Sequence, residues 1–126
     1  MKHLAAVYAV TTFVFLGLDA VWLSTMANRL YKPELQDLLA ENFRPAPALL
    51  FYVLYIGGIV GFVVLPAAKP VDALLRGAAF GLVAYATYDL TNQATLARWS
   101  TCVTLADLAW GALATALAAA AAKVLV

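Results

Sequence analysis

Four long apolar stretches constrain the fold of this chain more than any other feature of its sequence. They cover residues 4–26, 48–66, 73–94 and 101–125. At a rise of 1.5 Å per residue, about 20 residues of helix cross the ~30 Å hydrocarbon core of a bilayer. Short links make successive helices antiparallel neighbours. The sequence therefore predicts an all-α integral membrane protein, with residues 1–126 forming one domain of four transmembrane helices in an antiparallel bundle.

The composition agrees with a membrane protein and excludes several function classes. Apolar residues make up 65% of the chain and charged residues only 12%, against about 25% charged in a typical soluble domain. A net charge of +1 without a basic cluster argues against nucleic-acid binding. The single cysteine, Cys102, and single histidine, His3, exclude an internal disulfide, CxxC motifs, histidine-rich di-iron sites and bis-histidine haem. We expect no metal site and no cofactor.

The first connection has the pattern of an amphipathic helix over residues 33–43. Apolar residues recur at positions 31, 35, 38, 39 and 43, on one helical stripe. Pro33 suits a first helical turn, and Glu34 suits the positive end of the helix dipole. The opposite face is acidic, whereas a helix on a lipid surface is typically rich in Lys and Arg. We therefore expect this helix to lie over the mouth of the bundle, with a plain interfacial connector as the alternative.

Asp19, Asp89 and Asp107 lie inside apolar stretches, at a similar predicted depth. They are about seven, five and six residues from the helix ends that face the first connection. This spacing places them roughly 7–11 Å from one membrane surface. A carboxylate in hydrocarbon costs roughly 2.5–3.5 kcal/mol on insertion scales. Three such groups at one depth therefore predict a polar site within one leaflet.

Helical periodicity adds aromatic and polar residues to this site. A single stripe of the third stretch carries Gly81, Tyr85, Tyr88, Asp89 and Asn92, and Asp-x-x-Trp occurs in both the first and the fourth stretch. The predicted ligand-binding residues are Asp19, Trp22, Tyr52, Tyr55, Tyr85, Tyr88, Asp89, Asn92, Asp107 and Trp110. The catalytic candidates, if the site is catalytic, are Asp89, Asp107 and Asp19, acting as general acid or base. The spacing Gly57-x-x-x-Gly61 predicts close helix packing or a dimer face.

Three functions remain open from the residues alone. In the first, the pocket binds, and in a catalytic version modifies, a lipid or small lipophilic molecule. In the second, the chain is an accessory or structural membrane subunit whose aspartates act as interhelical hydrogen-bond glue. In the third, the chain is a small proton- or cation-coupled transporter that works as a dimer, with Asp19 as the coupling carboxylate. Membrane lipids are expected partners, and a homodimer or a partner membrane protein stays open.

The segments YDLTNQATLARW (88–99), TLADLAWG (104–111) and DAVWL (19–23) resemble a family of small bacterial membrane proteins catalogued as domain of unknown function 2177. The resemblance extends over essentially the whole chain, although Ser100 follows Trp99 where proline is expected. It implies a multi-pass protein of the bacterial inner membrane but no particular activity. The basic residues divide equally between the two sides, so the positive-inside rule leaves the orientation open. The residues that the resemblance singles out are Asp19, Trp22, Tyr88, Asp89, Asn92, Asp107, Trp110 and Gly111.

Overall fold

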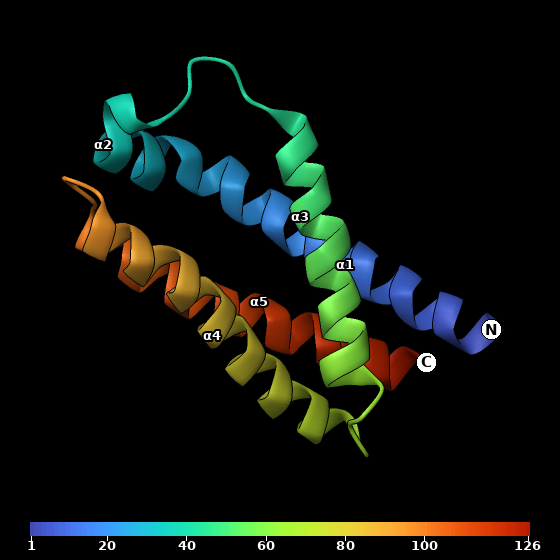
Figure 1. Cartoon of the computed structure of the whole chain (residues 1–126). Coiled ribbons are helices and arrows are strands. Elements are labelled where there is room, and N and C mark those ends of the chain that lie inside the picture. Colours follow the sequence, from blue (N-terminus) through green and yellow to red (C-terminus); the bar gives the residue numbers. More distant parts are fainter.

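The computed structural model describes all 126 residues and is helical apart from short links (Figure 1). The helices are α1 (Lys2–Met26), α2 (Lys32–Leu35), α3 (Pro45–Gly58), α4 (Pro70–Thr95) and α5 (Thr101–Leu125). Wider π-helical turns extend α1 through Ala27–Tyr31 and α3 through Ile59–Val64, and a 3-10 turn at Gln36–Leu38 follows α2. The predicted fold class, an all-α membrane bundle, is confirmed.

Three helical segments are both long enough and apolar enough to cross a membrane. They are Lys2–Leu38, Pro45–Val64 and Thr101–Leu125. α4 has 26 residues, which is sufficient length, but it is less apolar because it carries Asp72, Arg76 and Asp89. α4 is therefore not among the spans that length and hydropathy indicate, and its crossing stays a prediction.

α4 and α5 form the tightest pair in the bundle and run antiparallel, as Figure 1 shows. Glycines make this approach possible. A Cβ atom on Gly81 would lie 2.1 Å from the Gly111 carbonyl oxygen, and one on Gly111 would lie 2.3 Å from the Tyr85 ring. Small residues at helix contacts are typical of membrane bundles, where close backbone packing stabilises the fold.

Gly57 and Gly61 do not play this role. A Cβ atom on either residue would meet nothing within 4 Å. The prediction that their spacing serves close packing inside the bundle is therefore wrong. This part of the chain instead packs through branched side chains on its other face, and Ile56, Ile59 and Val63 are buried against α1, α4 and α5.

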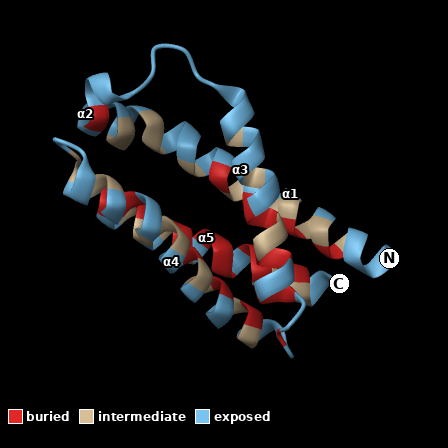
Figure 2. Ribbon diagram, viewed as in Figure 1, coloured by how far each residue is buried: buried red, intermediate tan, exposed pale blue.

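Most apolar residues face outward. Only 26 of the 126 residues are buried, although 65% of the chain is apolar, so the remaining apolar side chains form an outer surface suited to lipid. Figure 2 shows the buried residues gathered where α3 crosses the α4–α5 pair, with exposed residues on the outer faces. The end of the bundle near α2 is more loosely packed.

The helical segment Lys32–Leu38, called the cap below, covers that end. It is shorter than the predicted helix 33–43. Helical structure continues from α1 through the π turn and ends at Leu38. Gln36 has a φ of 47°, a left-handed conformation that stops a helix. The acidic face of the cap contacts the α4–α5 link: Asp37 pairs with Arg98, and Ser100 Oγ donates a 2.6 Å hydrogen bond to Glu34.

Candidate functional site

Asp19 links three helices. Its carboxylate accepts a hydrogen bond from the Tyr52 hydroxyl of α3 and a 3.2 Å hydrogen bond from the Trp110 indole of α5. Asp19 itself lies on α1 and is buried. Two donors from two other helices therefore fix the position of this carboxylate within the bundle.

Asp107 is held by a second chain of hydrogen bonds that starts on the opposite helix. The Trp22 indole of α1 donates to the Tyr31 hydroxyl at 2.9 Å, and Tyr31 donates to the carboxylate of Asp107 at 2.5 Å. Each Asp-x-x-Trp motif thus serves the carboxylate of the other helix. Trp110 reaches Asp19 directly, whereas Trp22 reaches Asp107 through Tyr31.

The antiparallel register of α1 and α5 explains this exchange. Residues three apart lie on the same helical face, so two opposed Asp-x-x-Trp motifs can place each aspartate level with the partner's tryptophan. The same register stacks Trp22 on Trp110, with ring centroids 4.7 Å apart and planes 7° from parallel. The two indoles pack face to face and together form an aromatic wall.

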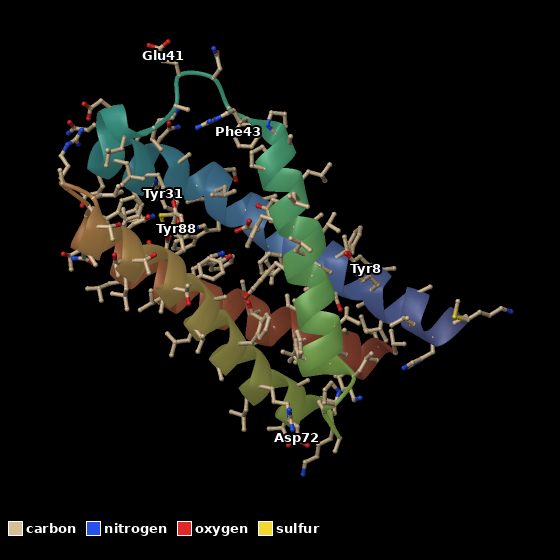
Figure 3. The ribbon with its side chains drawn as sticks, in the orientation of Figure 1. Tyr8, Tyr31, Glu41, Phe43, Asp72 and Tyr88 are labelled. Atoms are coloured by element: carbon tan, nitrogen blue, oxygen red, sulfur yellow. The ribbon has the colours of Figure 1, made fainter.

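This wall borders a cavity of about 410 Å³ between α1, α3, α4 and α5. Its lining is mostly aromatic or aliphatic, with two carboxylates and no basic residue. The lining residues are Asp19, Trp22, Leu23, Tyr31, Phe51, Tyr52, Ala84, Tyr85, Tyr88, Asp107 and Trp110. Figure 3 shows Tyr31 and Tyr88 in the space between the extension of α1 and α4.

Asp89 lies behind this cavity. It is 0% exposed, and no hydroxyl, amide or basic group donates to either of its oxygens. The contact of Gly81 with Gly111, and of Gly111 with Tyr85, sets a register in which the next turn of α4 brings Asp89 opposite Asp107. Both oxygens of Asp89 are buried without a hydrogen-bond partner in the chain, so this carboxyl group has no donor of its own to compensate its burial.

The structure brings most of the predicted site residues together. Asp19, Trp22, Tyr52, Tyr85, Tyr88, Asp107 and Trp110 all line the cavity. Asp89 is buried outside the lining. Tyr55 lies in the packed core, where its hydroxyl is 2.7 Å from Thr115 Oγ1. Asn92 lies one turn beyond Tyr88 and does not line the cavity.

Tyr31 lines the cavity but was not among the predicted site residues. As the first position of the apolar stripe before the expected helix 33–43, it was expected to contact the bundle mouth and not a buried aspartate. The π turn Ala27–Tyr31 continues α1 past Met26 and places Tyr31 nine residues beyond Trp22, its donor. The apolar lining residues Leu23, Phe51 and Ala84 were also missed, since each is ordinary in an apolar helix.

No cationic side chain in the cavity balances the carboxylates of the site. One ion pair occurs in the structure, between Arg98 and Asp37, and both side chains are largely exposed. The cavity lining includes no Lys, Arg or His. No group of three His, Cys, Asp or Glu side chains is arranged to hold a metal ion. The carboxylates of Asp19 and Asp107 therefore depend on hydroxyl and indole donors or on a ligand.

The family model described as a predicted membrane protein, DUF2177, matches residues 4–124. The chain belongs to this family. No curated protein and no solved structure matches it. In this DUF2177 protein, the motif residues expected from the resemblance have clear positions: Asp19, Trp22, Asp107 and Trp110 form the reciprocal network, and Gly111 forms the close contact with α4.

Replacing Tyr31 with phenylalanine in this DUF2177 protein is expected to lower the free energy of unfolding by about 1 kcal/mol. The change removes two hydrogen bonds, and interhelical hydrogen bonds in membranes are worth about 0.6 kcal/mol each on average. Titration with SDS in mixed micelles, followed by tryptophan fluorescence, measures the change. Tyr85→Phe is the matched control, because it removes a cavity hydroxyl that the network does not use. Equal stability of the two variants would contradict the assignment of Tyr31 as the bridge to Asp107.

Proposed function

We propose that this protein binds a lipid or a small lipophilic molecule in the cavity between α1, α3, α4 and α5. The observation that carries the proposal is the cavity itself, about 410 Å³ with mainly apolar and aromatic walls and two fixed carboxylates. Binding sites for small molecules are typically concavities of about 300–1,000 Å³ with apolar walls and a few convergent polar groups. The cavity has this composition within a chain whose outer surface is itself apolar.

The shape of the bundle supports entry from the side, within the membrane. The backbone of α3 stands away from α4, which packs against the π segment Ile59–Val64 instead. Two half-exposed aromatic residues, Phe51 of α3 and Tyr88 of α4, lie on opposite sides of the cavity, and their exposed fractions are 44% and 56%. At the other end, Tyr31 lines the cavity and the cap lies over the bundle. A lipophilic ligand would therefore enter between α3 and α4.

The proposal includes a multi-pass protein of the inner membrane with four crossings. α4 would cross as the antiparallel partner of α5, because the glycine contacts hold the two helices together along their length. Both termini then lie on one side of the membrane. The cap, the α4–α5 link and the cavity lie toward the other.

A structural role is a second candidate, and one observation favours it. Asp19 and Asp107 already accept hydrogen bonds that connect helices, as interhelical glue would. This role predicts that Asp107→Asn lowers the melting temperature while the wild-type protein carries no ligand. It therefore differs from ligand binding in an observable way.

Native mass spectrometry of protein extracted gently from its own membrane tests the proposal. The wild type is expected to retain a defined additional mass, and Ala84→Trp is expected to lose it, because an indole at this position fills the cavity. Ala79→Trp is the matched control, since Ala79 lies on the same helix and is exposed. Bare wild-type protein, or equal retention in both variants, would overturn the proposal. The same spectra give the oligomeric state and any copurifying protein.

A further inference from the structure

The charge of the cavity restricts what it can hold. Asp19 and Asp107 both line it, and the donors that contact them are neutral hydroxyl and indole groups. Such donors stabilise the ionised form of a carboxylate without neutralising its charge. A third carboxyl group, Asp89, lies behind Asp107 with no donor of its own. The cavity is thus acidic on its polar side and contains no cationic side chain.

The remaining walls are suited to a positive charge. Seven of the eleven lining residues are aromatic, and they include the stacked Trp22–Trp110 pair. The faces of aromatic rings carry negative electrostatic potential and attract organic cations, and aromatic cages are a common means of binding quaternary ammonium groups. Carboxylates and aromatic faces therefore favour the same sign of ligand charge.

Together, these features point to one class of ligand. We propose that the cavity binds a hydrophobic organic cation, meaning an apolar body that carries an ammonium group or a comparable delocalised positive charge. This inference rests on the proposed ligand site and adds its chemistry. A fatty acid or a phosphate monoester would place negative charge against Asp19 and Asp107, and a neutral lipid would leave both carboxylates without a counter-ion in a low-dielectric site.

Two isosteric probes of opposite charge test the inference on the wild-type protein. Equilibrium dialysis in dodecyl maltoside micelles compares tetraphenylphosphonium with tetraphenylborate, and protein-free micelles give the background. Saturable binding is expected for the phosphonium only. Saturable binding of the borate alone would overturn the inference that the ligand is a cation, but it would agree with a ligand site in the cavity. Absence of saturable binding for both probes would overturn the cation, and the native mass spectrum of the wild type then decides separately whether the site holds a ligand.

Charge variants locate the binding. In the Asp19→Asn, Asp107→Asn double variant, phosphonium affinity is expected to fall about tenfold or more, since a loss of about 1.4 kcal/mol corresponds to tenfold. Asp72→Asn is the control, because it removes a carboxylate at the far end of α4, away from the cavity. Circular dichroism establishes that each variant is folded. Equal affinities in the double variant and the control would overturn the assignment to this cavity.

Added lipids distinguish the source of the cation. Competition by phosphatidylethanolamine, but not by phosphatidylglycerol, would identify the ammonium group of a membrane lipid as the ligand. Competition by neither lipid would identify a free lipophilic cation. Both results agree with the proposal. Stronger competition by phosphatidylglycerol, which is anionic, would contradict it.

Discussion

Replacing Gly81 with alanine is expected to lower the free energy of unfolding by about 3 kcal/mol, at the upper end of the range for overpacked cores. The added Cβ atom would lie 2.1 Å from the carbonyl oxygen of Gly111 and 2.7 Å from the hydroxyl of Thr115. The first neighbour is backbone, which cannot turn aside as a flexible side chain can. α4 must therefore move away from α5. SDS titration followed by circular dichroism measures the loss.

Gly57→Ala is the control for this effect. It makes the same chemical change within a helix, but its Cβ atom meets nothing within 4 Å. We expect a slight gain in stability, because alanine is favoured over glycine in a helix by up to about 1 kcal/mol. Equal losses in the two variants would show that helix propensity, and not the α4–α5 contact, determines the result.

The Gly81 contact also matters for the candidate site. Tyr85 and Asp89 lie one and two turns further along α4, beside Gly111 and Asp107 of α5. A shift of α4 at Gly81 would move Asp89 and displace the Tyr85 ring from the cavity wall. We therefore expect Gly81→Ala to weaken phosphonium binding as well, whereas Gly57→Ala should leave it unchanged.

Replacing Phe15 with alanine is expected to cost about 3–5 kcal/mol, the usual range for truncating a buried phenylalanine. Phe15 is 0% exposed, and its ring centroid lies 6.3 Å from that of Tyr52 and 5.3 Å from that of Tyr55. The truncation would leave a void beneath both tyrosines. Because Tyr52 donates to Asp19, the change should also loosen this carboxylate.

Phe13→Ala serves as the control for Phe15. Phe13 lies two residues away on the same helix and is 82% exposed, so its ring faces the lipid and not the core. Its truncation should change the free energy of unfolding by less than about 1 kcal/mol, as is usual for surface positions. Thermal unfolding of both variants in the same micelles makes the comparison. Similar losses in Phe13→Ala and Phe15→Ala would contradict the arrangement of α1 against α3.

The polar site was largely predictable because intramembrane carboxylates are costly and therefore conspicuous. Asp19 and Asp107 stand out in any apolar stretch, and helical periodicity correctly associated Tyr52, Tyr85 and Tyr88 with them. The same reasoning could not separate Tyr55 from Tyr52. Both face the bundle, but Phe15, Phe51 and Phe80 enclose Tyr55 and leave its hydroxyl to Thr115.

The close contacts were less predictable, because glycine spacing alone does not identify a packing partner. Gly57 and Gly61 have the spacing of a packing motif but no neighbour, whereas Gly77 and Gly81 meet the backbone of α5. The difference lies in which face of each helix the rest of the bundle covers. The cap is also shorter than its sequence pattern predicts. The apolar pattern continues to Phe43, but the backbone turns at Gln36.

The sequence by itself determined the class of protein and the types of residue that form the site. Apolar length requires membrane helices, and carboxylates within them require compensation by some partner. Which side chain donates to which carboxylate was decided by tertiary structure alone. Tyr31 reaches Asp107, Trp110 reaches Asp19, and Asp89 has no donor. Helical periodicity selects a face of each helix, but it does not set the register between two helices. In this bundle, glycine contacts and a π turn set that register.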